Sequence, residues 1–491
     1  MKRHLSLLLA CLCAGCTVGP DFHTPDPPSI DRYVPGPAPD LALEARPDRD
    51  IPAEWWTLFG SSELDALVRR ALERSPTLDQ ARAKLVEARE LRAARVGATD
   101  VPAVNLTAGV TRQRVDPATF GVPIPEAAVP GPFTVYSIGA NVSYSFDIFG
   151  GTRRELEGLA AQIDYEAYEL EAARLTLAAN VVTTAVRLAG IRAQIESTEA
   201  ILAAQAKELA IVEQRYAAGG VAELDVRNQQ ALVAETRASL APLYAQREQA
   251  IHLLAIYAGD PPAAVPIPEL RLADLKLPAA IPSRLPSELV RQRPDIRAAE
   301  ALLHKASADI GVATANLYPK LSISGALSSS QLSLSDLFGS GINVWNIGAN
   351  LVQPLIRGGE LQARKRAAIA AYDQAEAAYR LAVLQGIQNV ADVLRVLEAD
   401  GRAESARSEQ ASRAADAYRI TLGRYDAGGV SQLAVLDAER TRLRAETERL
   451  QAIASRLSDT AALFQALGGG WWESADAIGG SSPMAQRARP N

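Results

Sequence analysis

Apolar residues recur at alternating steps of four and three over two long stretches of the chain. Between residues 153 and 216, one such row is Leu156, Ile163, Leu170, Leu177 and Ile191, and a second row is Val181, Leu188, Ile195, Leu202, Leu209 and Tyr216. In the second stretch, a spacing of seven residues separates Leu436, Leu443, Leu450, Leu457 and Phe464. This is the spacing of a coiled-coil seam, so both stretches predict long helices that pack along their sides.

The chain contains one structural unit written twice. The run Arg215-Tyr216-Ala217-Ala218-Gly219-Gly220-Val221 recurs 209 residues later as Arg424-Tyr425-Asp426-Ala427-Gly428-Gly429-Val430, and Ile138-Gly139-Ala140-Asn141 recurs at the same offset. We predict two repeats, 53–259 and 287–469, separated by a Pro-rich linker at 260–286. Each repeat reads helix, strand, strand, long helix, tight turn, helix, with hairpins at about 153–258 and about 360–467. The paired glycines supply the positive φ that a helix-ending turn needs.

Period-two alternation predicts four strands, at about 102–111, 136–148, 320–330 and 344–355. Ile138, Ala140, Val142, Tyr144 and Phe146 alternate with Gly139, Asn141, Ser143 and Ser145. Each strand therefore has one apolar and one polar face. A single strand of this kind fits a soluble sheet on a core, but no further amphipathic layer is left to cover these four. Four strands cannot close a barrel, and a bilayer tolerates no open sheet edge, so strands in lipid would have to be pooled by two, three or four chains.

The N-terminus has the pattern of an export signal. Lys2, Arg3 and His4 precede an apolar run to Cys13, which predicts a signal peptide at 1–15. The run Cys13-Ala14-Gly15-Cys16 resembles a lipobox, which makes Cys16 the predicted lipidation (palmitate) site; an ordinary secretory signal is the alternative. We expect a Pro-rich tether at 16–52, because proline fixes φ and removes backbone donors. A flexible tail is expected at 470–491.

Charge and residue types exclude several functions. The net charge is −6, and −8 once Lys2 and Arg3 are removed, which argues against nucleic acid as a partner. All three cysteines lie at or before position 16, and His23, His252 and His304 have no metal-ligand spacing. We therefore expect no metal, no cofactor and no enzyme activity.

Several motifs together carry a family resemblance. They are the lipobox followed by Thr17-Val18-Gly19-Pro20-Asp21-Phe22, the Trp55-Trp56 entry, the run Arg293-Pro294-Asp295-Ile296-Arg297 and the paired Arg-Tyr-x-Ala-Gly turns. The chain resembles the outer membrane factor (outer membrane efflux protein) family, lipoprotein branch. This resemblance implies a mainly α fold with a membrane β-barrel: a homotrimer with a twelve-stranded barrel in the outer membrane and a twelve-helix periplasmic coiled-coil tunnel. It also implies a periplasmic adaptor (membrane fusion) protein and an inner-membrane efflux pump, usually of the resistance–nodulation–division type, as partners in multidrug resistance.

The same resemblance assigns residues near the two turns. The family's gate tyrosine falls on Tyr425, and its aspartates in the two returning helices fall on Asp225 and Asp437. Val430 and Ala434 stand where better-known members carry an arginine and a further aspartate, and Asp416 is an additional candidate for a pore-lining ring. Adaptor docking is expected at Gly219, Gly220, Val221, Gly428, Gly429 and Val430. The alternative function is a periplasmic coiled-coil adaptor or scaffold lipoprotein without a pore.

Overall fold

A computed structural model of the chain describes residues 17–473 except 27, 37–39, 41–43, 47–50, 115–130, 265–266, 283–290 and 339–342. The predicted signal peptide and Cys16 therefore lie outside the described residues. The chain divides into two compact units. We call Met1–Thr24, Leu85–Tyr165 and Ala299–Tyr379 the sheet unit, and Pro25–Lys84, Glu166–Ala298 and Arg380–Asn491 the hairpin unit.

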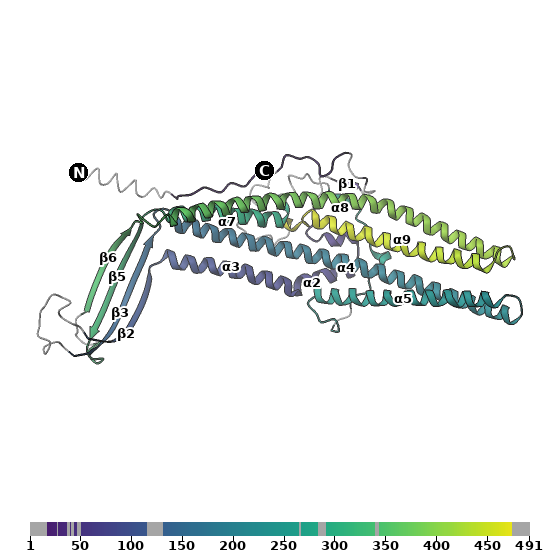
Figure 1. Cartoon of the computed structure of the whole chain (residues 1–491), viewed down its shortest axis with the longest axis horizontal. Helices are drawn as coiled ribbons and strands as arrows, with labels where there is room; N and C mark the ends of the chain where they lie inside the picture. Colours follow the sequence, from purple (N-terminus) through teal and green to yellow (C-terminus); the bar gives the residue numbers. More distant parts are fainter. Residues whose placement is uncertain are drawn as a thin grey trace. The chain divides into compact units, whose positions relative to one another are not determined.

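The sheet unit contains four antiparallel strands in the order β2-β3-β5-β6 (Figure 1). Their bounds are Ala103–Gln113 for β2, Phe133–Phe146 for β3, Lys320–Gln331 for β5 and Asn343–Val352 for β6. Each repeat supplies one pair, and β3 joins β5 across the repeats with Phe146 opposite Leu321. The four predicted strands are thus present, with ends shifted by up to three residues.

Six helices carry most of the remaining chain, and four of them supply residues to both units. These four are α3 (Pro76–Asp100), α4 (Gly151–Ala217), α7 (Pro294–Ala315) and α8 (Glu360–Asp426). The other two, α5 (Glu223–Tyr257) and α9 (Gln432–Ala466), follow the tight turns. Of the helices in the described residues, none has both the length and the apolar character that crossing a membrane requires.

The duplication read from the sequence is reproduced in the helix lengths. Helices α4 and α8 have 67 residues each, and α5 and α9 have 35 each. All four bounds of α8 and α9 lie 209 residues after those of α4 and α5. Figure 1 shows that each repeat forms one long helical hairpin, α4 with α5 in the first repeat and α8 with α9 in the second.

The core of the hairpin unit gathers residues that are far apart in the sequence. Trp55 and Phe59 of η1 (Trp55–Phe59) are at most 1% exposed, and the Trp55 ring stacks on Phe464 of α9 at 5.4 Å between centroids. Helix α2 (Ser62–Arg74) covers this core and is capped by Ser61, whose hydroxyl accepts a hydrogen bond from Leu64 N. The smaller elements of this unit are β1 (Glu44–Arg46), which pairs in parallel with β4 (Ala280–Pro282), η4 (Leu272–Asp274) and η5 (Trp471–Glu473).

The predicted tether and the predicted tail each have a described end that is bound to the rest of the chain. In the sheet unit, Val18 N donates to Phe149 O, and the buried Arg154 guanidinium pairs with Asp21 at 2.7 Å. In the hairpin unit, Trp471 Nε1 donates to Gln292 O at 2.7 Å. A proline-rich segment without regular secondary structure still binds where its polar groups find partners. Residues 474–491 of the expected tail lie outside the described residues.

Candidate functional site

The sheet has one apolar and one polar face, and its pairing register aligns each face across the strands. Leu106 lies opposite Ala140, which lies opposite Leu327, which lies opposite Trp345. One position along, Asn105 lies opposite Asn141, Ala326 and Asn346 in the same way. The period-two prediction therefore holds across the whole sheet and not only within each strand.

The apolar face is uncovered in the single chain. Leu106 is 76% exposed, Trp345 72% and Ile347 74%. Further exposed apolar side chains of this sheet are Val104, Val110, Leu327 and Leu351. Soluble monomers rarely expose a contiguous apolar patch of this kind, so the face marks contact with lipid or with another chain. Strands of 10 to 14 residues also have the length that crossing a bilayer at a tilt requires.

Both edges of the sheet are open. In the described part of the chain, β2 pairs only with β3 and β6 pairs only with β5, so each outer strand carries backbone N–H and C=O groups without ladder partners. In hydrocarbon each such group would cost several kcal/mol. A sheet with this apolar face is therefore incomplete as one chain.

The two turns between the paired helices have the same geometry. Gly219 N donates to Tyr216 O and Gly220 N to Arg215 O, at 2.9 and 2.8 Å. Gly428 N and Gly429 N repeat this pattern at 2.9 and 2.7 Å. These bonds satisfy the last carbonyls of α4 and α8, as in a Schellman motif.

One detail of the predicted turns is wrong. Only the first glycine of each pair has a positive φ, 75° at Gly219 and 74° at Gly428. The second glycine serves the turn through its N–H, because that group reaches back to the helix carbonyl. Val221 and Val430, which complete the two turn motifs, are both half-buried.

The residues assigned to the gate fall in different surroundings. The Asp225 carboxylate accepts a hydrogen bond from Ala222 N at 3.1 Å and so caps the start of α5. Asp416 pairs with Arg419 on its own helix at 3.3 Å, and Asp437 is exposed on α9. Within the described residues of one chain, no hydrogen bond or ion pair joins the three aspartates to one another.

Tyr425 is the gate candidate that the structure brings into contact with the other hairpin. Its hydroxyl accepts a hydrogen bond from Arg215 Nη1 at 3.3 Å, and the guanidinium carbon lies 5.5 Å from the ring centroid. Arg215 belongs to α4 and Tyr425 to α8, and the two are equivalent to within one residue in the duplicated turn motif. The last turns of the two long helices are therefore joined through one cation–aromatic pair.

Sequence reasoning missed a buried polar layer between the two hairpins. Gln205 of α4, Gln229 of α5 and Glu439 of α9 are fully buried, and Gln432 of α9 is 4% exposed. Gln432 Nε2 donates to Glu208 of α4 at 3.1 Å. A signal was present, because Gln432 and Glu439 are one heptad apart beside the apolar row that contains Leu436. Polar residues at a seam position are unusual enough to mark such a layer.

The segment after the predicted lipidation site is held in the sheet unit. Arg154 of α4 donates to Asp21, to Glu157 and to the carbonyl of Val18. Phe22 stacks on His304 of α7 at 4.4 Å, and the His304 ring contacts the Glu157 carboxylate at 2.9 Å. His304 is thus a packing residue, and contacts at Val18, Asp21 and Phe22 hold the segment in the sheet unit.

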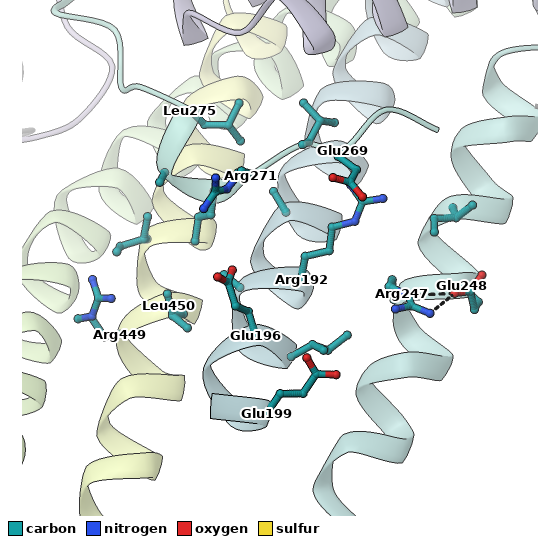
Figure 2. Close-up of a pocket in the computed structure, with 18 residues that line it drawn as sticks. Arg192, Glu196, Glu199, Arg247, Glu248, Glu269, Arg271, Leu275, Arg449 and Leu450 are labelled. Carbon is teal, nitrogen blue, oxygen red and sulfur yellow. Dashed lines mark hydrogen bonds and ion pairs between the residues drawn. The ribbon is translucent and has the colours of Figure 1, made fainter. Parts of the chain in front are cut away.

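The hairpin unit contains a cavity of about 900 Å³ (Figure 2). It lies between α4, α5, α9 and the segment 269–275, and Ile195, Leu270 and Leu450 are among its apolar lining residues. Its charged lining consists of Arg192, Arg247, Arg271, Arg449, Glu196, Glu199, Glu248 and Glu269. Burial lowers the pKa of Arg192, and Arg247 pairs with Glu248 at 2.6 Å. Four arginines balance four glutamates, so the cavity favours no ligand class. In the described residues no cluster of acidic, histidine and cysteine side chains fits a metal ion.

Comparison with known proteins gives a consistent result. The family model described as "Outer membrane efflux protein" matches residues 67–260 and 285–469. The pyoverdine export outer membrane protein OpmQ of Pseudomonas aeruginosa is 32% identical over 472 residues, which cover 96% of this chain and 97% of that protein. The toluene efflux pump outer membrane protein TtgF of Pseudomonas putida is 30% identical over 479 residues, which cover 96% of this chain and 98% of that protein. The solved structure of the outer-membrane channel OprN superposes with a TM-score of 0.82 at 30% identity, covering 93% of this chain and all of that one.

Proposed function

This chain belongs to the outer membrane efflux protein family, and from that premise we propose that three copies form the passive outer-membrane channel of a tripartite efflux system. The observation that carries the proposal is the uncovered apolar face of a sheet with two open edges. Pairing β6 of one copy with β2 of the next removes every edge once the ring closes. Three copies pool twelve strands, and the polar faces then line a wet interior.

The same arrangement gives the helices a role. Each chain brings two long hairpins whose seams are apolar, and three chains would place six hairpins around one axis as a periplasmic tunnel. A helix of 67 residues extends about 100 Å at 1.5 Å per residue, which is enough to cross much of the periplasm. A periplasmic adaptor or scaffold without a pore would leave the apolar face of the sheet exposed to water. We therefore do not propose that alternative.

Cys16 would add a lipid anchor to the barrel. The held segment from Val18 to Phe22 supports this proposal, because it fixes the chain to the sheet unit two residues after Cys16. A single acylated terminus binds membranes only moderately by itself. We therefore propose that the barrel is the principal anchor and that the lipid is the second one.

The periplasmic gate would lie at the two turns. Copies of Asp225, Asp437 and Asp416 around a threefold axis would form acidic rings, which favour cations and repel anions. The contact between Arg215 and Tyr425 would hold the hairpins of one chain together in the closed state. Adaptor hairpins would dock on the turn motifs Gly219-Gly220-Val221 and Gly428-Gly429-Val430. Their greater affinity for the open state would shift the equilibrium toward opening.

The pump, and not the channel, would select the cargo. Two relatives with nearly equal identity to this chain are named for different compounds, pyoverdine and toluene. Such a difference supports a wide duct that carries small organic molecules delivered by an inner-membrane pump of the resistance–nodulation–division type. No metal or cofactor is required for passive conduction.

Planar-bilayer recording of the purified lipidated protein tests this function. We expect discrete channels with a cation preference, and a mass for the detergent-solubilised protein equal to three chains. The double variant Asp225→Ala with Asp437→Ala should change the conductance and reduce the cation preference, while Glu446→Gln on α9 is the matched control. A protein that is a water-soluble monomer after delipidation, or that gives no channels, would contradict the proposal.

A further inference from the structure

Glu439 is a buried carboxyl group at the contact of the two hairpins. It lies on α9, is 0% exposed, and neither of its carboxyl oxygens has a hydrogen-bond partner among the described residues. Burying an ionised carboxylate without partners is strongly unfavourable, whereas a neutral carboxyl group costs much less. The packing therefore requires either a proton or a compensating cation at this position.

The neighbouring side chains include no cation that pairs with Glu439. The Glu208 carboxylate of α4 raises the pKa of Glu439, and burial together with the Asp426 carboxylate at the end of α8 raises the pKa of Glu208 in turn. Tyr418 of α8 presents its ring, and the Arg442 guanidinium of α9 lies 4.9 Å above that ring. In the described part of the chain, no ion pair joins Arg442 to Glu439.

The remaining groups around this site are neutral or already paired. The Gln205 side-chain amide of α4 lies beside Glu439 but outside hydrogen-bonding geometry. On the α5 side, Gln229 is neutral, and the Glu235 carboxylate is paired with Arg440 of α9 at 3.0 Å. The amide oxygens of Gln205, Gln229 and Gln432 are buried and have no hydrogen-bond partner among the described residues. Unpaired acceptor atoms therefore outnumber unpaired donor atoms in this layer, where the unpaired donors are the Gln205 amide nitrogen and Arg442 Nε, and a carboxylic O–H would supply a further donor.

We propose that Glu439 is a proton-binding latch, protonated when the two hairpins pack and ionised when they separate, so that acid favours the packed tip. The latch differs from the acidic rings described above, because it lies inside one chain and acts on the contact between its hairpins. Its effect on conduction rests on the proposed gate, but the latch itself does not.

The direction of the pH effect follows from linkage. Burial, assisted by the charge of Glu208 and opposed by the charge of Arg442, raises the pKa of Glu439 from 4.5 to about 7 in the packed state. When the hairpins separate, the carboxyl group regains water and its pKa returns toward the ordinary value. The stabilisation of the packed state is therefore complete below pH 4.5 and is lost as the pH rises to about 7. Within this window each pH unit shifts the packed-to-separated ratio by up to about tenfold in each chain.

Hydrogen–deuterium exchange of the intact trimer in detergent measures the latch without any transport assay. The readout is the exchange of the α9 amides at 432–445, corrected for the intrinsic pH dependence, between about pH 5 and about pH 8. The amides at 455–466 in the same chains serve as an internal reference. We expect protection of the first set to fall across this range by up to tenfold per unit, while the reference set changes less.

Two substitutions and one control decide the assignment. Glu439→Gln keeps the shape and removes the charge, so protection at 432–445 should become high and independent of pH. Glu208→Gln should move the transition to lower pH, because one charge that raises the Glu439 pKa is removed. Glu446→Gln, one heptad along α9 and paired with Arg449, should behave like the wild type. An infrared band of a neutral carboxyl group near pH 6, lost in Glu439→Gln, would report the proton directly.

The outcomes are separable. If Glu439→Gln retains the wild-type pH dependence, or if the wild type shows none at 432–445, the latch is refuted while channel formation is untouched. If the wild type and variants follow the expected pattern but form no channels in bilayers, the latch stands and the proposed function fails.

Discussion

Replacing Leu106 by arginine tests whether the apolar face of the sheet lies in lipid. Leu106 is the fourth of the eleven residues of β2 and is 76% exposed in the single chain. In a bilayer its side chain would lie among acyl chains, somewhat off the midplane. Arginine on the lipid face of a β-barrel costs about 2–4 kcal/mol at the midplane and less toward the interface. We therefore expect a loss of about 2 kcal/mol per chain.

The adjacent residue provides a matched control. Asn105 lies on the polar face of the same strand, so Asn105→Arg would place its charge in the wet interior and should cost less than about 0.5 kcal/mol. Chemical unfolding of the protein refolded into liposomes, followed by the band shift of folded trimers on unheated gels, gives both values. If Leu106 instead faced water, Leu106→Arg would also change the unfolding free energy by no more than about 0.5 kcal/mol. Equal stabilities of the two variants would refute the lipid-facing assignment.

The remaining predictions concern the core, the turns and the carboxyl groups of Asp400 and Asp459. Trp55→Ala should lower the unfolding free energy by about 3–5 kcal/mol through the cavity left beside the buried core, measured by denaturant unfolding. Gly219→Ala should cost about 1–2 kcal/mol because φ is 75° there, whereas Gly423→Ala inside α8, with open space around it, should stabilise by about 0.5–1 kcal/mol. Burial raises the pKa of Asp400 to about 7, and the Asp459 carboxyl group adds to the rise. The stabilisation of the folded state by neutral Asp400 is lost as the pH rises from 3.8 to about 7. Asp400→Asn should therefore reduce the pH dependence of the thermal unfolding midpoint over that range, and an unchanged pH dependence would contradict this prediction.

Periodicity alone was enough to predict most of the architecture. The heptads, the Arg-Tyr-x-Ala-Gly turns and the period-two runs gave the order of elements and the duplication, because these patterns are local consequences of helix and strand geometry. The strand ends were less accurate. β3 begins at Phe133 and not near 136, because pairing with β2 extends the strand through Thr134 and Val135.

Features that depend on long-range packing were not predictable. Nothing near Phe22 in the sequence indicates that its ring stacks on His304, and nothing near Trp55 indicates Phe464. The buried Glu439 also depends on packing, since a glutamate on a heptad helix normally belongs to the solvated face. Its burial is set by the approach of the α4 helix from the other repeat.

The candidate gate aspartates lie on α5, α8 and α9, and among the described residues of one chain they form no cluster. Asp225 has a structural explanation as a helix cap, and Asp437 is exposed. Their proximity would arise only between chains, around the axis of the assembly. The assignment of these aspartates to the gate therefore stays a prediction that the conductance measurements address.

In the proposed channel, alternate residues of each strand face lipid and a water-filled interior shared by three chains. Because no cysteine occurs after position 16, single cysteines can be placed at each position from 103 to 113 without interference from other thiols in the barrel. In liposomes, we expect Asn105, Thr107 and the other odd positions to react with a water-soluble thiol reagent, and Leu106 and the other even positions to respond only to a lipid-soluble quencher. Uniform reactivity along β2, with no period of two, would contradict this arrangement.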